Sequence, residues 1–336
     1  MKQIAFGDSI TAGAGASVQA NCYVNLLNTM LGLVIDNTGV STAMAIDECS
    51  VLYSKNTVLG DKSTVMFGTN DQAKYNGDVV KKSNFIDCLR AYGIWLACDS
   101  KLATPANGVT FTGAWSNGYA WSCYASTVVG DKATFSVTGT TISLGFIRQY
   151  SNIGVFKVKI DGVDKGNFNI GGDVRTILGA AYGAMALSFG GLTAGAHAVE
   201  ISVVSGGTNG QVYFHWFSGT NAKAKVVFGN IPHAIAYTYG GSNANVDAYN
   251  TAIANLAIEL SGYGLDVSMV NIVGALVPTD MYDNVHPNNS GHQKIANLFY
   301  SALTGQPAIS YTACNIYQGS DGNIYGGTLG SLIRLN

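Results

Sequence analysis

The chain has 336 residues, of which 11% are charged, and its 18 basic and 20 acidic residues leave a net charge of -2. Lysine and arginine nowhere cluster beyond a pair such as Lys81 and Lys82, so the sequence lacks the basic surface that binding to a phosphate backbone requires. It also contains no run of 18 apolar residues. We therefore expect neither a nucleic acid nor a membrane as a partner.

An apolar stretch begins at residue 3, which leaves no room for a secretory signal peptide in this chain. The six cysteines are scattered without a CxxC pair, a spacing that predicts buried thiols rather than a zinc site or a disulfide framework. No ligand cluster indicates a metal, and we expect no cofactor.

The first hundred residues alternate short apolar runs with longer helical stretches. Strands that alternate with helices predict a parallel sheet. The expected strands are 3–6, 33–36 and 63–68, and the expected helices are 19–32, 42–54 and 78–98.

From residue 101 the pattern changes to short alternating segments divided by glycine-rich turns, which predicts an all-β section through residue 222. Within it, the pair Asp161-Gly162 predicts the turn of a β-hairpin. Strand and helix patterns then resume, with strands expected at 225–230 and 266–273 and helices at 244–262 and 290–303.

This order predicts three parts. Residues 1–100 and 223–304 form one α/β domain, and residues 101–222 form an all-β domain inserted into it. Residues 305–336 form an appendage of strands or a hairpin, to which we assign no role.

Gly7-Asp8-Ser9 follows the first expected strand. A serine in this place can be the N-cap of a helix, or it can be a nucleophile exposed at a strand-to-helix turn. The choice depends on partners elsewhere in the chain. Asp8, and Asp71 at the end of a later strand, are expected to order their own turns through backbone hydrogen bonds.

Asp283 stands three residues before His286 in the segment DNVHP. A histidine that acts as general base needs a carboxylate to hold its ring in one tautomer, and a short loop can supply both groups. With an ordinary pKa near 6.5, histidine can accept and return a proton near neutral pH. The pair therefore predicts the base and the orienting carboxylate for Ser9.

A tetrahedral intermediate of acyl transfer also requires donors for its oxyanion. Gly39, in DNTGVS, can present its backbone N–H, and Asn70, at the end of the strand in FGTND, offers a neutral side-chain donor.

These four blocks, GDSITAG at 7–13, NTG at 37–39, GTND at 68–71 and DNVHP at 283–287, occur in the order found in the SGNH hydrolase superfamily, the GDSL-like lipases and acylesterases. The sequence resembles that superfamily over residues 1–100 and 223–304. The resemblance implies a three-layer, flavodoxin-like fold with a five-stranded parallel sheet and its site at the carboxyl ends of the strands.

The resemblance also implies a role for each matched residue. Ser9 is the nucleophile, His286 the base and Asp283 its orienting partner. The oxyanion hole consists of the backbone N–H groups of Ser9 and Gly39 and the side chain of Asn70.

Three further residues are candidates for substrate contact. Trp115 and Trp121 lie in the expected insertion, where a tryptophan face can stack on a sugar ring or can equally fill the sandwich core. His233 follows a strand of the α/β domain, where it can meet a substrate or remain an ordinary surface histidine. We expect His292 to be structural.

Together these features predict a serine esterase that removes acyl groups, in particular acetyl, from a carbohydrate or polysaccharide. The insertion resembles the jelly-roll modules of carbohydrate esterases, including those on bacteriophage tail proteins. That likeness suggests an extracellular or virion-associated protein, trimeric if it belongs to a phage tail. Two alternatives remain open: a hydrolase of lipids or acyl thioesters, and a catalytically inactive glycan-binding adhesion module.

Overall fold

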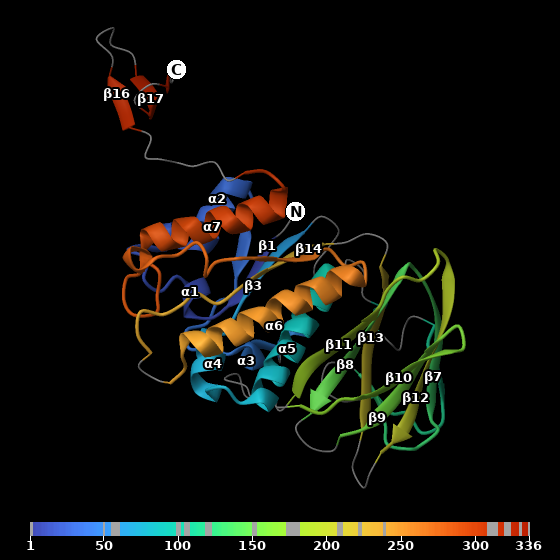
Figure 1. Cartoon of the computed structure of the whole chain (residues 1–336). Helices are drawn as coiled ribbons and strands as arrows, with labels where there is room; N and C mark the ends of the chain where they lie inside the picture. Colours follow the sequence, from blue (N-terminus) through green and yellow to red (C-terminus); the bar gives the residue numbers. More distant parts are fainter. Residues whose placement is uncertain are drawn as a thin grey trace.

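The computed structural model describes most of the chain (Figure 1). The described residues are 3–49, 51–54, 61–98, 102–103, 108–117, 123–149, 153–172, 182–206, 211–220, 224–237, 240–307, 315–318, 324–328 and 331–334.

A parallel five-stranded sheet organises the first part of the structure, in the order β15-β14-β3-β1-β2. Its short, apolar strands are largely buried, as expected where helices cover both faces of a parallel sheet. Their bounds are β1 (Gln3–Gly7), β2 (Ile35–Asn37), β3 (Lys62–Met66), β14 (Lys225–Gly229) and β15 (Val267–Val270).

Side chains alternate along each strand and fill two cores. In β1, Ile4 and Phe6 join the core that includes residues of α5 (Val79–Ala97) and α6 (Asn243–Gly262). Ala5 joins the other, with residues of α2 (Tyr23–Leu31) and α7 (Asn289–Thr304). Helices therefore lie on both sides of the sheet, and the result is an α/β domain of three layers (Figure 1).

Short helices sit around this frame and depart from the expected elements. The expected helix 19–32 is divided into η1 (Gln19–Asn21) and α2, and 42–54 into α3 (Ala45–Cys49) and η2 (Leu52–Ser54). The sequence pattern did not indicate the helices α4 (Thr69–Tyr75) and η5 (Pro278–Asp280), and it raised α1 (Ser9–Ala12) only as a helix that begins near Ser9.

Ten strands between residues 102 and 220 form two antiparallel sheets, with orders β10-β9-β12-β7-β5 and β11-β8-β13-β4, and β6 also pairs with β13. The sheets pack face to face: Phe146 of β8 stacks on Phe156 of β9 with ring centroids 4.1 Å apart. The bounds are β4 (Leu102–Ala103), β5 (Thr110–Thr112), β6 (Tyr124–Ser126), β7 (Lys132–Thr138), β8 (Thr141–Gln149), β9 (Val155–Ile160), β10 (Val163–Asn169), β11 (Tyr182–Phe189), β12 (Ala196–Ser205) and β13 (Val212–Thr220).

The hairpin predicted at Asp161-Gly162 is confirmed. It joins β9 to β10, and both of its turn residues have positive φ, 51° and 78°. An Asp-Gly pair tolerates this conformation, which matches the twist of the two strands.

An aromatic junction connects the sandwich to the α/β domain. Trp95 of α5 packs against Tyr53 of η2 and Trp216 of β13, with ring centroids 4.7 and 5.0 Å apart, and α5 lies against β11. Because these rings belong to one continuous buried cluster, the two domains share a core.

The described part of the C-terminal segment is a three-stranded antiparallel sheet of β16 (Asn315–Gln318), β17 (Ile324–Thr328) and β18 (Ser331–Arg334). Among the helices that the structure describes, none has both the length and the apolar character needed to cross a bilayer.

Candidate active site

Ser9 is the first residue of α1, directly after the carboxyl end of β1. The N-cap of this helix is Asp8, whose carboxylate accepts the N–H of Ile10 at 3.0 Å. Ser9 therefore does not cap the helix, and its hydroxyl can bond to another partner. That partner is His286, with Ser9 Oγ 3.0 Å from His286 Nε2.

His286 and Asp283 lie in the loop between η5 and α7. Asp283 Oδ1 accepts the backbone N–H groups of Val285 and His286, at 2.8 and 2.7 Å, which closes the loop around the carboxylate. Its other oxygen, Oδ2, lies 2.8 Å from His286 Nδ1. In this arrangement Nδ1 carries the proton, and Nε2 is left to accept the proton of Ser9.

The electrostatics of Asp283 suit this role. Partial burial by itself raises the pKa of this carboxyl, but the hydrogen bonds from the His286 ring and from the two backbone N–H groups bring it below its usual value. Asp283 is therefore ionised throughout the range in which histidine titrates, and it can stabilise an imidazolium on His286.

The two expected oxyanion donors differ in their surroundings. Asn70 lies in the first turn of α4, and its Nδ2 donates one hydrogen to the carbonyl of Ala43 at 2.9 Å. The amide carries a second hydrogen. The N–H of Gly39 already donates to Asn37 Oδ1 at 3.0 Å, so it is engaged within its own turn.

Two residues that the sequence analysis did not single out hold these loops in place. The Asn37 side chain accepts a hydrogen bond from the Gly39 N–H through Oδ1, and its Nδ2 donates to the carbonyl of Thr11 at 3.0 Å. Gly15, with φ at +90°, packs so closely on the loop 281–288, which holds Asp283 and His286, that a Cβ there would lie 2.2 Å from the carbonyl oxygen of Pro287. Both roles depend on contacts between distant segments, which no local pattern signals.

Two carboxylates are buried beside the site. Burial raises the pKa of Asp8 to about 6, against the opposing influence of the Ile10 N–H, the Thr69 side chain and the charge of His286. Burial likewise raises the pKa of Asp71 well above its usual value, and its carboxylate accepts the N–H of Ala45 at 3.3 Å. Asp8 thus orders its own turn as expected, whereas Asp71 also ties α4 to α3.

His292 is buried in α7 and links three segments. Its Nε2 lies 3.0 Å from the carbonyl of Ala14, and its Nδ1 accepts the N–H of Tyr23 at 3.3 Å. Burial lowers the pKa of His292, and the nearby charge of His286 adds to this effect. A neutral ring with its proton on Nε2 satisfies both contacts, which is a structural role.

A cavity of 310 Å³ lies over the loop that holds Asp283 and His286. Its wall combines polar side chains with apolar surface, and apolar atoms make up the larger part of it. Besides His286 and Asp283, the lining residues are Thr69, Asn70, Gln72, Ala73, Tyr237, Gly240, Asn284 and Val285. Asn70 is part of this wall, so the base and one expected oxyanion donor face the same space.

His233 does not line that cavity. It pairs with Asp247 at 2.8 Å and lines a separate cavity of 350 Å³ with Asn243 and Met281. Ile235 lines this second cavity and Asn284 lines the first, and the Ile235 N–H donates to the Asn284 carbonyl at 2.7 Å.

The structure describes one of the two candidate tryptophans. Trp115 is half-buried beside Phe111 in the sandwich, with ring centroids 5.2 Å apart. Trp121 lies outside the described residues. Neither Trp115 nor His233 is among the described residues that line the cavity at His286.

No family model and no curated protein sequence matches this chain. Solved structures with a similar arrangement include a two-domain esterase active on acetylated mannans, co-crystallised with mannopentaose, at 11% identity and a TM-score of 0.34, covering 67% of this chain and 91% of that one. A family two carbohydrate esterase from Cellvibrio japonicus is 16% identical with a TM-score of 0.29, covering 51% of this chain and 52% of that one.

The CBM36-1 domain of a multidomain xylanase, from the hindgut metagenome of Trinervitermes trinervoides, is also similar. It is 16% identical with a TM-score of 0.28, covering 37% of this chain and 98% of that domain. The candidate site stands on its own geometry.

Proposed function

We propose that the protein is a serine esterase that removes O-acetyl groups from a carbohydrate through an acyl-enzyme. The observation that carries this proposal is the chain of hydrogen bonds from Ser9 Oγ through the His286 ring to the Asp283 carboxylate. A hydroxyl on a base that is itself oriented by a carboxylate is the arrangement of an activated nucleophile.

In the first half of the reaction, His286 Nε2 takes the proton of Ser9 as Oγ attacks the ester carbonyl. Asp283 holds the ring in place and stabilises the imidazolium that forms. When the tetrahedral intermediate collapses, His286 gives that proton to the departing sugar hydroxyl, and the acyl group remains on Ser9. Water then attacks the acyl-enzyme with His286 as base again, which releases the carboxylic acid and restores Ser9.

The oxyanion is received by the Ser9 N–H and by the second hydrogen of the Asn70 amide. The bond from Asn70 to the Ala43 carbonyl fixes the direction of that amide before substrate arrives. Donors that are already oriented cost no reorganisation when charge develops. Gly39 contributes a third donor if its N–H leaves Asn37 Oδ1 for the oxyanion.

The cavity at His286 supports a polar substrate with a small acyl group. Thr69, Gln72 and Tyr237 add side-chain donors and acceptors around a volume of 310 Å³. These groups can satisfy sugar hydroxyls, and the apolar part of the wall, which includes Ala73 and Val285, can receive a small acyl group. Membership of the SGNH hydrolase superfamily, a jelly-roll identity for the sandwich, and an extracellular or phage-tail location are part of the same proposal.

The test compares wild type with Ser9→Ala for hydrolysis of p-nitrophenyl acetate, butyrate and octanoate, and for release of acetate from acetylated xylan and mannan. Ser261→Ala, an exposed serine at the end of α6, is the matched control. We expect Ser9→Ala to lower turnover by at least about 10⁴-fold, because the rest of the triad cannot act alone, and Ser261→Ala to leave it unchanged.

The different substrates distinguish the proposed function from its alternatives. Release of acetate that Ser9→Ala abolishes supports the proposal. A preference for octanoate without acetate release would indicate a lipid or thioester hydrolase. If wild type and Ser9→Ala are equally inactive on every ester, the enzyme proposal fails, and a glycan-binding adhesion module takes its place.

A further inference from the structure

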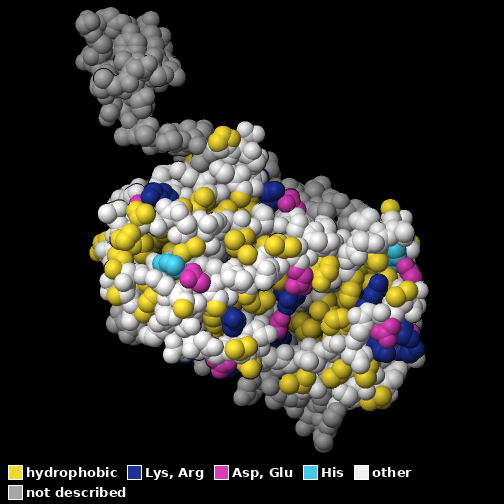
Figure 2. All heavy atoms as spheres, viewed as in Figure 1, with side chains coloured by type: hydrophobic (Ala, Val, Ile, Leu, Met, Phe, Trp, Pro, Cys, Tyr) yellow, Lys and Arg dark blue, Asp and Glu magenta, His cyan; other side chains and the backbone are white. Residues whose placement is uncertain are grey.

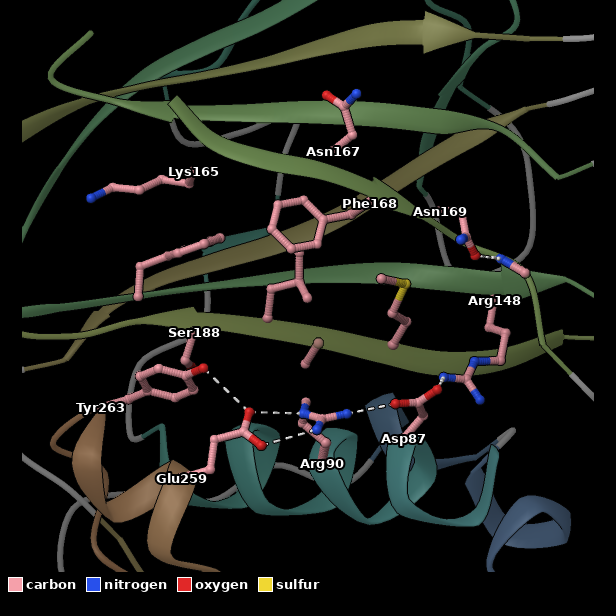
Figure 3. Close-up of a pocket in the computed structure, with 15 residues that line it drawn as sticks. Asp87, Arg90, Arg148, Lys165, Asn167, Phe168, Asn169, Ser188, Glu259 and Tyr263 are labelled. Atoms are coloured by element: carbon pink, nitrogen blue, oxygen red, sulfur yellow. Dashed lines mark hydrogen bonds and ion pairs between the residues drawn. The ribbon is translucent and has the colours of Figure 1, made fainter. Parts of the chain in front are cut away.

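A third and larger cleft lies between the sandwich and the helices α5 and α6. Its volume is 610 Å³, and none of its described lining residues lines the cavity at His286 (Figure 3). Figure 2 shows an apolar area here beside a row of alternating acidic and basic side chains. The proposed esterase mechanism makes no use of it.

The cleft exists because the edge of the sandwich is open. β10 and β11 are the end strands of the two sheets, and β10 does not fully cover the inner face of β11. Met185, Leu187 and Phe189 of β11 are therefore only half-buried, and Phe168 of β10 meets Phe189 edge to face with centroids 5.9 Å apart. An apolar floor left open in this way marks a site for a ligand or partner.

A fixed polar wall stands opposite this floor. Arg90 of α5 makes a two-point ion pair with Glu259 of α6, at 3.2 and 3.1 Å, and a further bond of 2.5 Å to Asp87. The Tyr263 hydroxyl donates to Glu259 at 3.3 Å. A guanidinium that is held by two hydrogen bonds is rigid, so the wall presents its donors and acceptors in fixed directions (Figure 3).

The charges of the cleft do not cancel. Arg90, Arg148 and Lys165 line it with only two carboxylates, those of Asp87 and Glu259. Arg148 is almost fully buried and must share Asp87 with Arg90, at 3.3 Å.

Two of these cations could form a further hydrogen bond or ion pair. The Arg148 Nε has no hydrogen-bond partner, and among the described residues no carboxylate forms an ion pair with Lys165. One positive charge is therefore uncompensated within the described lining. The half-buried Lys165 ammonium is accessible, and an anionic ligand group would compensate this charge.

We infer that this cleft binds an oligosaccharide that carries carboxylate groups, such as one built of uronic acid units. The C–H face of a pyranose ring packs on Phe168 and the β11 floor, its hydroxyls bond to Glu259 and Tyr263, and its carboxylate pairs with Lys165. The proposed esterase site would then act on a chain held by the same molecule. Binding itself requires neither Ser9 nor the esterase proposal.

Isothermal titration calorimetry of the full chain tests this, with α-1,4-linked trigalacturonate as the probe and the neutral galactose trisaccharide of the same linkage for comparison. Neither sugar carries an acyl group, so the result does not depend on esterase activity. We expect submillimolar binding of trigalacturonate and binding of the neutral sugar at least about tenfold weaker.

Variants assign the binding to the cleft. Lys165→Gln should weaken it by about tenfold through loss of charge, and Phe168→Ala by at least about tenfold through loss of the packing surface. Lys132→Gln is the matched control, because that lysine pairs with Glu200 on the same sandwich and does not line the cleft. Near-ultraviolet circular dichroism and the melting temperature verify that each variant is folded.

Four results would overturn the inference: no binding of either sugar, equal binding of both, affinity unchanged in folded Lys165→Gln and Phe168→Ala, or equal loss in Lys132→Gln. Sedimentation tests the other candidate occupant, a second copy of the chain. A wild-type dimer that Phe168→Ala dissociates would show that the cleft is a self-association surface instead.

Discussion

At the scale of single residues, Asp283 makes two kinds of contact: its Oδ1 accepts two backbone N–H groups that close the loop 281–288, and its Oδ2 bonds to the His286 ring, which we propose it orients. Asn in its place can keep the first kind of contact, because its carbonyl oxygen still accepts the two backbone N–H groups. It fails in the second, because an amide that presents N–H to the ring favours the wrong tautomer.

We therefore predict that Asp283→Asn lowers kcat for p-nitrophenyl acetate by about 10³- to 10⁴-fold while the melting temperature changes little. Asp78→Asn is the control, since Asp78 also accepts two backbone N–H groups, at the start of α5. A variant that retains full kcat would show that Asp283 does not orient the base.

The buried carboxyl of Asp8 predicts a dependence of stability on pH. Its pKa is raised to about 6 in the folded protein, chiefly by burial, from 3.8. Between these values the folded state binds more protons than the unfolded state, so the free energy of unfolding falls as pH rises. The loss approaches about 3 kcal/mol and is complete above the folded pKa.

Asp8→Asn does not titrate, and its carbonyl oxygen can still accept the Ile10 N–H. We predict that the difference in unfolding free energy, variant minus wild type, rises by about 2.4 kcal/mol between pH 4 and pH 7, because a part of the full effect is already lost at pH 4. Urea unfolding at pH 4, 5, 6 and 7 measures it. A difference that stays constant over this range would contradict a raised pKa at Asp8.

The residues with chemistry in their side chains could be selected from the sequence, because motif and spacing point to them. Ser9 and His286 are 277 positions apart, and the structure places their side chains in hydrogen-bond contact. The engagement of the Gly39 N–H by Asn37 could not be foreseen, because it depends on the exact path of a turn. The catalytic roles of Ser9 and Asp283 are predictions that the variants above test.

At the scale of elements, the loop 281–288 and the segment after α1 are held together by a close backbone contact at Gly15. Its φ is +90°, and a Cβ at this position would lie 2.2 Å from the carbonyl oxygen of Pro287, so there is no room for a side chain. Gly15→Ala must therefore move one segment away from the other, and with it the distance between Ser9 and His286 changes.

We predict that Gly15→Ala lowers kcat at least about tenfold and destabilises the protein by about 2 kcal/mol or more. Gly32→Ala is the matched control: Gly32 also has a positive φ, 62°, but nothing lies within 4 Å of its Cβ position. It should cost about 1 kcal/mol with kcat unchanged. Equal kcat in the two variants would show that the contact at Gly15 does not position the site.

Long elements were easier to predict than short ones for a physical reason. α5, α6 and α7 extend over several turns, so each is recognisable as a long stretch without proline, and their bounds lie within one residue of the expected ones. α1 and α4 have four and seven residues, too few for a periodic pattern, and they form because Asp8 and Gly68 cap them at the ends of buried strands.

At the scale of the whole molecule, the sandwich is not an independent attachment. Trp95 of α5 packs on both Tyr53 and Trp216, whose rings also meet edge to face, so one buried cluster includes residues of both domains. The sequence could indicate two kinds of secondary-structure pattern, one of alternating strands and helices and one of strands alone. It could not show this junction, because the three rings come from segments more than 40 positions apart.

A shared core predicts cooperative unfolding: heating should give one calorimetric transition for the α/β domain and the sandwich, with equal calorimetric and van't Hoff enthalpies. Trp95→Ala removes the central ring of the junction and should cost about 3–5 kcal/mol and divide the transition into two. Trp115→Ala, a half-buried tryptophan outside the junction, should lower the melting temperature less and keep a single transition. Two transitions in the wild type would show instead that the domains unfold independently and that the aromatic junction contributes little to their coupling.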